Sequence, residues 1–410
     1  MKRLLLGAAV VLVAAGVAAA IFVHSREAKD VRGSSTEEFV PKEPVVVKPP
    51  EPGIAWPTFG YDAERLRVAP ANGLKPPFRA VWRFRAGTLV EFPPVVAYGR
   101  LYFATNAGVV HAISAKTGRH AWSYARRRCQ AASPAVFEHL VYVTFLNRPP
   151  CNTKRKDVDG EIVAFRSKNG RVRWRRTIGP TESSPLVVNG RVYVGDWRGR
   201  VYAFDAKTGA TRWSFGTGGK IKGAVAISGR RLYVGSYDHN VYALNARTGK
   251  LLWKAGAQQR LGHRGTFYST PAAAYGRVYV GSTDGKVYSF GAGSGKLRWA
   301  QGTGGFVYGS PAVWHERVYV GSYSGRFLCF DAATGDVKWS FKANGPISGS
   351  ATILNGVVYF ATLKQRTYAL DTRTGRELWQ FSDGKYTPLV ADDRRVYLVG
   401  YARIYGMVPR

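Results

Sequence analysis

The stretch that decides the fold is Arg191–Trp213, which reads RVYVGDWRGRVYAFDAKTGATRW. Two apolar segments with alternating side chains, VYVG and VYAFDA, flank a short turn that contains glycine. A second turn, Lys-Thr-Gly, leads to a third segment that carries Trp213. Alternation with a period of two, bounded by glycine turns, predicts short antiparallel β-strands. The glycine of Lys-Thr-Gly is expected to supply a positive φ in a hairpin turn.

The same unit recurs along the chain and can be followed by its tryptophan. Tryptophan occupies the equivalent position at residues 122, 174, 213, 253, 299, 339 and 379, and most of the spacings are 39 or 40 residues. A period of about 40 residues with several short strands in each unit is typical of a β-propeller. Each tryptophan is expected to pack between neighbouring blades, where it buries a large apolar area.

Counting the central hairpins predicts an all-β, eight-bladed propeller. The hairpins occupy residues 95–118, 135–170, 186–209, 225–249, 272–295, 312–335, 352–375 and 389–410. The last hairpin is not followed by a tryptophan strand, whereas an additional one, Ala80–Phe84, precedes the first hairpin. We therefore expect the N-terminal strand to complete blade eight, which closes the ring and leaves no unpaired edge.

The segment before the first hairpin, together with the repeats, resembles one particular propeller family. Residues 56–74 read WPTFGYDAERLRVAPANGL, and VYAFDAxTGxxxW-type repeats follow. Together these motifs resemble the pyrroloquinoline-quinone (PQQ)-type propeller superfamily, from Trp56 to the last residue. That superfamily includes quinoprotein alcohol dehydrogenases, BamB-type outer-membrane assembly scaffolds without catalytic activity, and extracellular sensor domains. WD-type propellers are excluded, since the sequence contains no Trp-Asp dipeptide.

The N-terminus is typical of an exported protein. After the basic residues Lys2 and Arg3, residues 4–23 are 20 apolar residues, long enough to span a bilayer. We expect a single transmembrane helix that acts as a signal anchor (residues 1–23), a proline-rich linker (24–55) and the propeller (56–410). The propeller would lie outside the cytoplasm, tethered to the cytoplasmic membrane. The alternative is a signal peptide cleaved after the small residues 18–20, which would release a secreted propeller.

The net charge bears on which partners the protein binds. The formal net charge of +34 favours contact with polyanions, but the arginines are scattered through every repeat. We expect nucleic acid not to be a partner in the cell, and the propeller to be a monomer.

In an exported chain, Cys129 and Cys151 are the natural disulfide pair, which would pin the long insertion of residues 147–161. Cys329, within FLCFDA, is expected to be a buried free thiol.

The connections that enter the innermost strands should form a ring around one mouth of the central channel. A pocket with a few convergent polar groups is the default hypothesis for a ligand site. These connections supply the candidate ligand-binding residues Glu91, Glu182, Lys220, Lys222, Arg264, Tyr268, Tyr308 and Lys385.

The family resemblance leaves open whether the protein is an enzyme. For a dehydrogenase it implies a PQQ cofactor, a Glu/Asn/Asp set that binds calcium and, in many members, a pair of adjacent cysteines. No two cysteines are adjacent in this sequence, and Glu91, Glu182 and Asp196 do not map onto the calcium ligands. We therefore expect a scaffold that binds a protein, a peptide or an anionic envelope polymer, with no catalytic residues, metal or cofactor. The alternative is a PQQ- and calcium-dependent dehydrogenase. A third class is a sensory ectodomain, but no kinase or other signalling domain is fused in this sequence.

Overall fold

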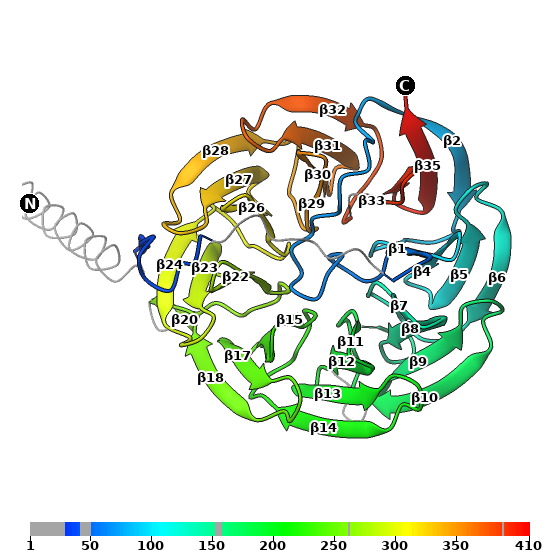
Figure 1. Cartoon of the computed structure of the whole chain (residues 1–410), viewed down its shortest axis with the longest axis horizontal. Helices are drawn as coiled ribbons and strands as arrows, with labels where there is room; N and C mark the ends of the chain where they lie inside the picture. The colour runs from blue at the N-terminus through cyan, green and yellow to red at the C-terminus, as the bar shows by residue number, and fades with distance from the viewer. Residues whose placement is uncertain (1–28, 42–50, 152–157, 261–262, 388) are drawn as a thin grey trace, which may run out of the picture.

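The protein folds into a ring of eight antiparallel sheets, as the repeats predict (Figure 1). The structure is a computed structural model and describes residues 29–41, 51–151, 158–260, 263–387 and 389–410. Every regular element within these ranges is a β-strand. The predicted membrane segment, residues 1–23, lies outside the described residues. Within the described ranges, no helix has the length and apolar character needed to cross a membrane.

Each blade has four strands, which follow one another from the innermost to the outermost. Blade one consists of β3 (Val95–Ala97), β4 (Arg100–Ala104), β5 (Val109–Ser114) and β6 (His120–Ala125). Blade two consists of β7 (Ala135–Phe137), β8 (Leu140–Phe145), β9 (Gly160–Arg166) and β10 (Val172–Ile178). Blade three consists of β11 (Leu186–Val188), β12 (Arg191–Gly195), β13 (Arg200–Asp205) and β14 (Thr211–Gly216). Blades four and five consist of β15 (Ala226–Ser228), β16 (Arg231–Gly235), β17 (Asn240–Asn245) and β18 (Leu251–Gly256); β21 (Ala272–Ala274), β22 (Arg277–Gly281), β23 (Lys286–Gly291) and β24 (Leu297–Gly302). Blades six and seven consist of β25 (Ala312–Trp314), β26 (Arg317–Gly321), β27 (Arg326–Asp331) and β28 (Val337–Lys342); β29 (Thr352–Leu354), β30 (Val357–Thr362), β31 (Arg366–Asp371) and β32 (Glu377–Phe381).

Blade eight confirms the predicted closure. Its inner strands β33 (Leu389–Ala391), β34 (Val396–Val399) and β35 (Arg403–Pro409) come from the C-terminal part, and its outer strand is β2 (Phe78–Arg85). Strand β2 pairs antiparallel with β35 along its whole length, from Phe78 opposite Pro409 to Arg85 opposite Arg403. The two segments lie side by side in Figure 1 although they are more than 300 residues apart.

Tryptophan joins each blade to the next, as expected. The indole nitrogen of Trp174 donates a 2.8 Å hydrogen bond to the carbonyl oxygen of Ala206 in the following blade. Its ring lies against Gly209, the glycine of Lys-Thr-Gly, where a Cβ atom would come within 2.6 Å of the indole carbons. Gly209 also has a φ of +70°. The glycine is therefore needed twice, for the turn and for the approach of the neighbouring ring. Similar Trp–Gly contacts occur between Trp82 and Gly118, Trp122 and Gly170, Trp213 and Gly249, Trp253 and Gly295, Trp299 and Gly335, and Trp339 and Gly375.

Substitutions at two glycines should separate the cost of the positive φ from the cost of a clash with the tryptophan ring. We expect Gly209→Ala to lower the free energy of unfolding by about 2–4 kcal/mol, because backbone strain adds to a clash with Trp174. Gly190→Ala is the matched control, since Gly190 has a φ of +69° with no atom within 4 Å of a built Cβ. The control should cost about 1–2 kcal/mol. If both variants lose the same free energy of unfolding in urea denaturation, the contact between Trp174 and Gly209 does not contribute to stability.

The lead-in segment, residues 57–69, lies across the middle of the ring (Figure 1). Its backbone carbonyls accept hydrogen bonds from the innermost strands of five blades. These bonds run to Pro57 from Val136, to Ala63 from Ile227, to Glu64 from Ala273, to Leu66 from Val313 and to Arg67 from Ile353. The segment therefore closes one end of the central channel and ties blades two, four, five, six and seven together.

Part of the segment expected to be a linker packs on the propeller. Val31 forms an antiparallel bridge with Ala300, on the outer strand of blade five. The carboxylates of Glu37 and Glu38 form ion pairs with Arg298 on the same strand. Nearer the propeller, β1 (Ile54–Trp56) pairs with β3 and adds a fifth strand to blade one. Residues 29–41 are thus held by complementary charge and backbone pairing, which the mixed composition of the segment did not indicate.

Candidate functional site

Most of the candidate residues gather at one mouth of the central channel. Because successive strands alternate in direction, the connections into the innermost strands share one end of the ring with the turns between second and third strands. A hollow of about 60 Å³ at this end is lined by five of the eight candidates, namely Glu91, Glu182, Lys222, Tyr268 and Tyr308. Phe59 of the lead-in segment also lines this hollow, so the lead-in lies at its inner end.

The other three candidates differ in their positions. The ammonium group of Lys385 lies 5.4 Å from the ring centre of Tyr386, which lines the hollow. Lys220 lies beside the mouth, with its ammonium group 5.1 Å from the ring centre of Trp197. Arg264 is exposed on β20 (His263–Arg264), which pairs with β19 (Gln259–Arg260) in the insertion before blade five, and it does not line the hollow. The insertion forms its own two-stranded ribbon, and the guanidinium group of Arg264 lies near Gly256 at the end of the outer strand of blade four.

Lys222 is the best-enclosed cation of the mouth. Its ammonium group forms an ion pair of 3.3 Å with Glu182. The same group lies 4.7 Å from the ring centre of Trp197, 5.7 Å from that of Tyr237 and 5.5 Å from that of Tyr268. Cations are attracted to aromatic faces, and more strongly when water is excluded. The rings and the carboxylate therefore fix Lys222 in one position.

The aromatic side chains form an arc around the mouth, which we call the aromatic rim. Tyr268 contacts Tyr308 with ring centres 5.1 Å apart, and Tyr308 contacts Tyr323 at 5.0 Å. Phe306 and Tyr401 are among the most exposed large apolar side chains of the described residues. The rim comprises Trp197, Tyr237, Tyr268, Phe306, Tyr308, Tyr323, Tyr386 and Tyr401.

Half of the aromatic rim was missed from the sequence. Trp197, Tyr237, Tyr323 and Tyr401 lie in the turns between the second and third strands of blades three, four, six and eight. A recurring pattern could have found them, since each ring follows, by one or two residues, a glycine at or just after the end of the second strand, as in GDW, GSY, GSY and GY. Strand alternation places these turns at the same end as the candidate connections.

Two carboxylates face the centre of the mouth. Burial, together with the neighbouring carboxylate of Glu182, raises the pKa of Glu91 to about 7, although Lys222 and Lys385 oppose this shift. Burial also raises the pKa of Glu182, and Lys222 offsets part of that rise. The charge at the mouth therefore changes near neutral pH, mainly through Glu91.

The raised pKa of Glu91 predicts a pH-dependent stability. Between its ordinary value of 4.5 and about 7, the folded protein holds a proton that the unfolded chain has lost. The free energy of unfolding should therefore fall as the pH rises through this range, by about 1–3 kcal/mol, and then level off. Subtracting the unfolding profile of Glu91→Gln from that of the wild type removes the contribution of other titrating groups, such as Asp62. Unfolding profiles that stay parallel from pH 4.5 to 8 would contradict the prediction.

The residues present do not fit a calcium–quinone site. Both oxygens of Asp196 are occupied, since they accept bonds from the backbone nitrogens of Gly179, Arg198 and Arg200 and from the hydroxyl of Tyr202. At the mouth, the remaining carboxylates lie beside lysines. Within the described ranges, no group of three His, Cys, Asp or Glu side chains has a metal-binding arrangement. A hollow of about 60 Å³ is also well below the roughly 300–1,000 Å³ of ordinary ligand pockets.

The cysteines are arranged as predicted. Cys129 and Cys151 form a disulfide with a Cα–Cα distance of 5.7 Å, which fixes the start of the blade-two insertion. Residues 152–157 of that insertion lie outside the described residues. Cys329 is a buried free cysteine, and burial raises the pKa of its thiol to about 12. A thiol with so high a pKa is not a nucleophile at neutral pH.

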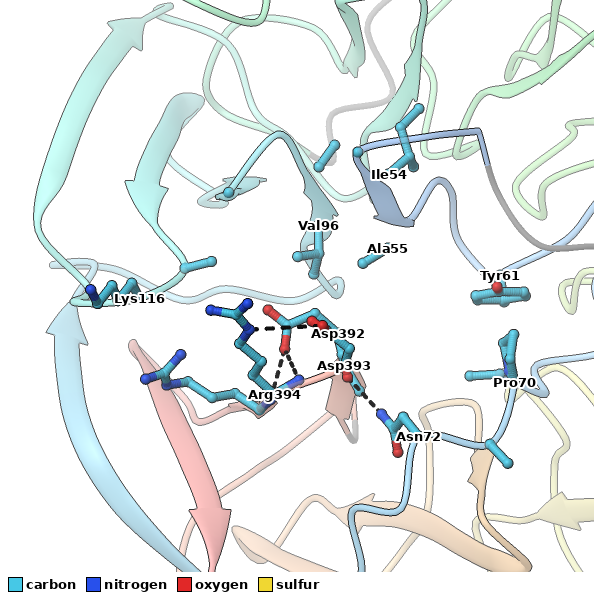
Figure 2. A pocket seen from close by; sticks show the side chains of 18 residues that line it. Ile54, Ala55, Tyr61, Pro70, Asn72, Val96, Lys116, Asp392, Asp393 and Arg394 are labelled. Atoms are coloured by element: carbon cyan, nitrogen blue, oxygen red, sulfur yellow. Dashed lines mark hydrogen bonds and ion pairs between the residues drawn. The ribbon is translucent and has the colours of Figure 1, made fainter.

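A larger hollow of about 710 Å³ lies at the opposite end of the ring, between blades one and eight (Figure 2). Its floor is formed by small and apolar residues, and its polar groups mostly bind one another. The side chain of Asp392 accepts hydrogen bonds from the hydroxyl of Tyr397 and the backbone nitrogens of Arg394 and Arg395. Asn72 donates to the backbone carbonyl of Asp392. The charged side chains of Lys116, Asp393, Arg394 and Arg395 also line this hollow.

Comparison with known proteins identifies the family. The sequence profile of the family described as outer membrane protein assembly factor BamB matches residues 79–196, 158–306 and 291–404. The chain belongs to this family. The matches cover the propeller from the closing strand β2 to β35.

Relatives of known function come from both branches of the superfamily. The outer membrane protein assembly factor BamB of Moranella endobia is 29% identical over 131 residues, covering 29% of this chain and 30% of that protein. The quinohemoprotein alcohol dehydrogenase ADH-IIG of Pseudomonas putida is 33% identical over 153 residues, covering 31% of this chain and 20% of that protein. The chain thus matches less than a third of the length of either relative.

Solved structures show the same fold. The BamB structure from Moraxella catarrhalis superposes with a TM-score of 0.65 and 16% identity, over 81% of this chain and 98% of that one. The quinohemoprotein alcohol dehydrogenase from Comamonas testosteroni gives a TM-score of 0.71 and 16% identity, over 88% of this chain and 81% of that one. Both BamB and the quinohemoprotein alcohol dehydrogenase therefore share this fold, and the fold alone does not identify the function of the chain.

Proposed function

We propose that the protein is a membrane-tethered, extracytoplasmic binding scaffold without catalytic activity. Its partner is a protein, a peptide or an anionic envelope polymer that docks on the aromatic rim. The proposal draws on the family assignment and on the N-terminal segment expected to anchor the chain. It also follows from the chemistry of the mouth, which offers rings and cations in place of metal ligands.

The observation that carries the proposal is an exposed aromatic rim over a channel with little internal space. Phe306 is 51% exposed, yet the hollow below it measures about 60 Å³. Such a site contacts its partner with its rim and does not enclose a small molecule. Tyrosine and tryptophan give a large contact area at low cost in conformational entropy, and they are enriched among residues that dominate binding energy. Lys220 and Lys385 add positive charge beside the rings, which favours an anionic partner.

Site-specific photo-crosslinking tests where the partner binds. A photoreactive phenylalanine analogue is placed at Phe306 in one variant and at Val337 in another, and intact membranes are irradiated. Val337 is the matched control, because it is 49% exposed but lies on the outer strand of blade six. We expect one defined adduct from position 306, lost when Tyr308→Ala is added, and none from position 337. Equal labelling at both positions, or none at 306, would refute the rim as the docking site.

The second candidate function is a PQQ- and calcium-dependent dehydrogenase. The observation that favours it is the similarity to quinohemoprotein alcohol dehydrogenases, in sequence and in fold. Against it stand the lysines that accompany Glu91 and Glu182 and the saturated carboxylate of Asp196. We derive no reaction step for this candidate, because the residues present do not form a site for the calcium ion.

A further inference from the structure

Three buried N–H donors belong to two side chains that line one small hollow. They are the indole nitrogen Nε1 of Trp56 and the guanidinium nitrogens Nε and Nη2 of Arg67. Trp56 is 2% exposed and Arg67 is 1% exposed, and both side chains line the same hollow. None of the three nitrogens has an acceptor among the described residues. A buried donor without an acceptor costs about 1–3 kcal/mol, and more when it is charged, so three at one place indicate a missing acceptor.

The hollow has room for one small species. It measures about 20 Å³ and is also lined by Phe59, Ser350, Thr352 and Thr387. A volume of roughly 10–15 Å³ on this measure is enough for a single water molecule, so the hollow can hold one small species of about that size. The ring of Phe59, whose centre lies 4.8 Å from the guanidinium carbon of Arg67, forms one wall. Phe59, Ser350 and Thr387 line the hollow at the mouth as well, so the two spaces adjoin.

The surroundings carry excess positive charge. Arg65 is fully buried beside Arg67, and its guanidinium group is held by backbone carbonyls and a hydroxyl, including the carbonyl of Val225 at 2.8 Å. Asp62 is the carboxylate that acts on both arginines, but burial raises its pKa to about 7. At neutral pH it therefore offsets only part of the charge of two buried guanidinium groups. Unbalanced buried charge is costly, and an anion would relieve it.

The donor chemistry separates an anion from a water molecule. A water molecule can accept only two hydrogen bonds, whereas the two side chains that line this hollow carry three N–H groups without an acceptor. An anion accepts from all three and needs no acceptor in return. We propose that a small monovalent anion of the halide class, such as chloride, binds between Trp56 and Arg67 and fixes the lead-in segment in the channel.

This site is distinct from the aromatic rim. Its donors come from β1 and from the lead-in segment, which closes one end of the channel, so the anion is a structural component. Its consequence is a stability that depends on the identity of the anion and not only on ionic strength. Halide binding to the folded state alone must raise the melting temperature.

Crystallography with bromide is the direct test. Crystals of the full-length protein are soaked in sodium bromide, and data are collected at the bromine absorption edge. We expect an anomalous peak within hydrogen-bond distance of Trp56 Nε1 and Arg67 Nε. A water molecule at that position, with no anomalous signal, would overturn the proposal.

A titration in solution shows whether binding also matters outside the crystal. Sodium chloride replaces sodium gluconate at constant ionic strength, because gluconate is too large for the hollow. We expect the melting temperature to rise with chloride, and Trp56→Phe to shift the half-saturating chloride concentration about tenfold higher by removing one donor. Trp299→Phe is the matched control; it removes an indole bond to Ala332 at another blade interface and should leave the chloride dependence unchanged. Identical melting in chloride and gluconate, or equal shifts in both variants, would refute the site.

Discussion

Deletion of residues 78–85 should unfold the ring at moderate temperature, with a loss of at least about 5 kcal/mol in the free energy of unfolding. The deletion removes β2, the outer strand of blade eight, and exposes the backbone edge of β35. It also removes Trp82, whose ring packs on Gly118 of blade one and whose indole nitrogen bonds to the carbonyl of Ala115 at 3.3 Å. The measurement is thermal melting followed by circular dichroism.

Chain length is controlled by a second variant, in which residues 78–85 are replaced by an eight-residue Gly-Ser linker. This variant keeps the distance between Pro77 and Ala86 but supplies no tryptophan and little tendency to form a strand. We expect it to melt as early as the deletion. A linker variant as stable as wild type would mean that strand pairing does not close the ring.

Glu161→Gln should lower the free energy of unfolding by about 3–5 kcal/mol. Glu161 is buried at the start of the third strand of blade two, and three arginines converge on its carboxylate. The distances are 2.6 Å to Nε of Arg126, 3.3 Å to Nε of Arg128 and 3.4 Å to Nε of Arg175. Glutamine keeps the shape but removes the charge, so among the described residues Asp159 is left as the charged partner of the mostly buried Arg128. Urea denaturation measures the loss.

The control for Glu161→Gln is Glu138→Gln. Glu138 pairs with Lys207 at 3.0 Å, and both side chains are exposed. An exposed pair contributes about 0–1 kcal/mol, so this variant should be nearly as stable as wild type. Equal effects of the two substitutions would show that the convergence of arginines on Glu161 gives no special stability.

The propeller could be predicted because its stabilising contacts repeat. Each Trp and each Lys-Thr-Gly turn stands at a fixed place in the unit, so the packing of Trp174 on Gly209 follows from the period alone. The orphan strand around Trp82 could be assigned to blade eight for the same reason. The lead-in segment could not be placed in this way. Arg65 and Arg67 suggest a surface by their charge, yet both side chains lie in the core. Backbone N–H groups of five blades bind the carbonyls of the segment, and carbonyl oxygens such as those of Val225 and Pro311 accept hydrogen bonds from the two guanidinium groups.

The ligand-binding role of the candidate residues remains a prediction, but their positions can be compared with the structure. The connections into the innermost strands were followed in the sequence, and in the structure Glu91, Glu182 and Lys222 line one hollow. The turns between the second and third strands were treated as plain turns, so Trp197 and its counterparts were missed. Arg264 follows a local ribbon that no repeat predicts. Contacts that depend on non-repeating segments, such as residues 29–41 on blade five, require the structure.

The most direct test of a scaffold without catalytic activity is thermal melting of the full-length protein with and without PQQ plus calcium. A bound ligand at 100 times its dissociation constant stabilises the folded state by about 2.7 kcal/mol, which raises the melting temperature by several degrees. Each additive alone serves as the control. The account predicts no shift with both, because lysines accompany the carboxylates of the mouth and the hollow measures about 60 Å³. A rise that requires both PQQ and calcium would contradict it and identify the protein as a quinoprotein.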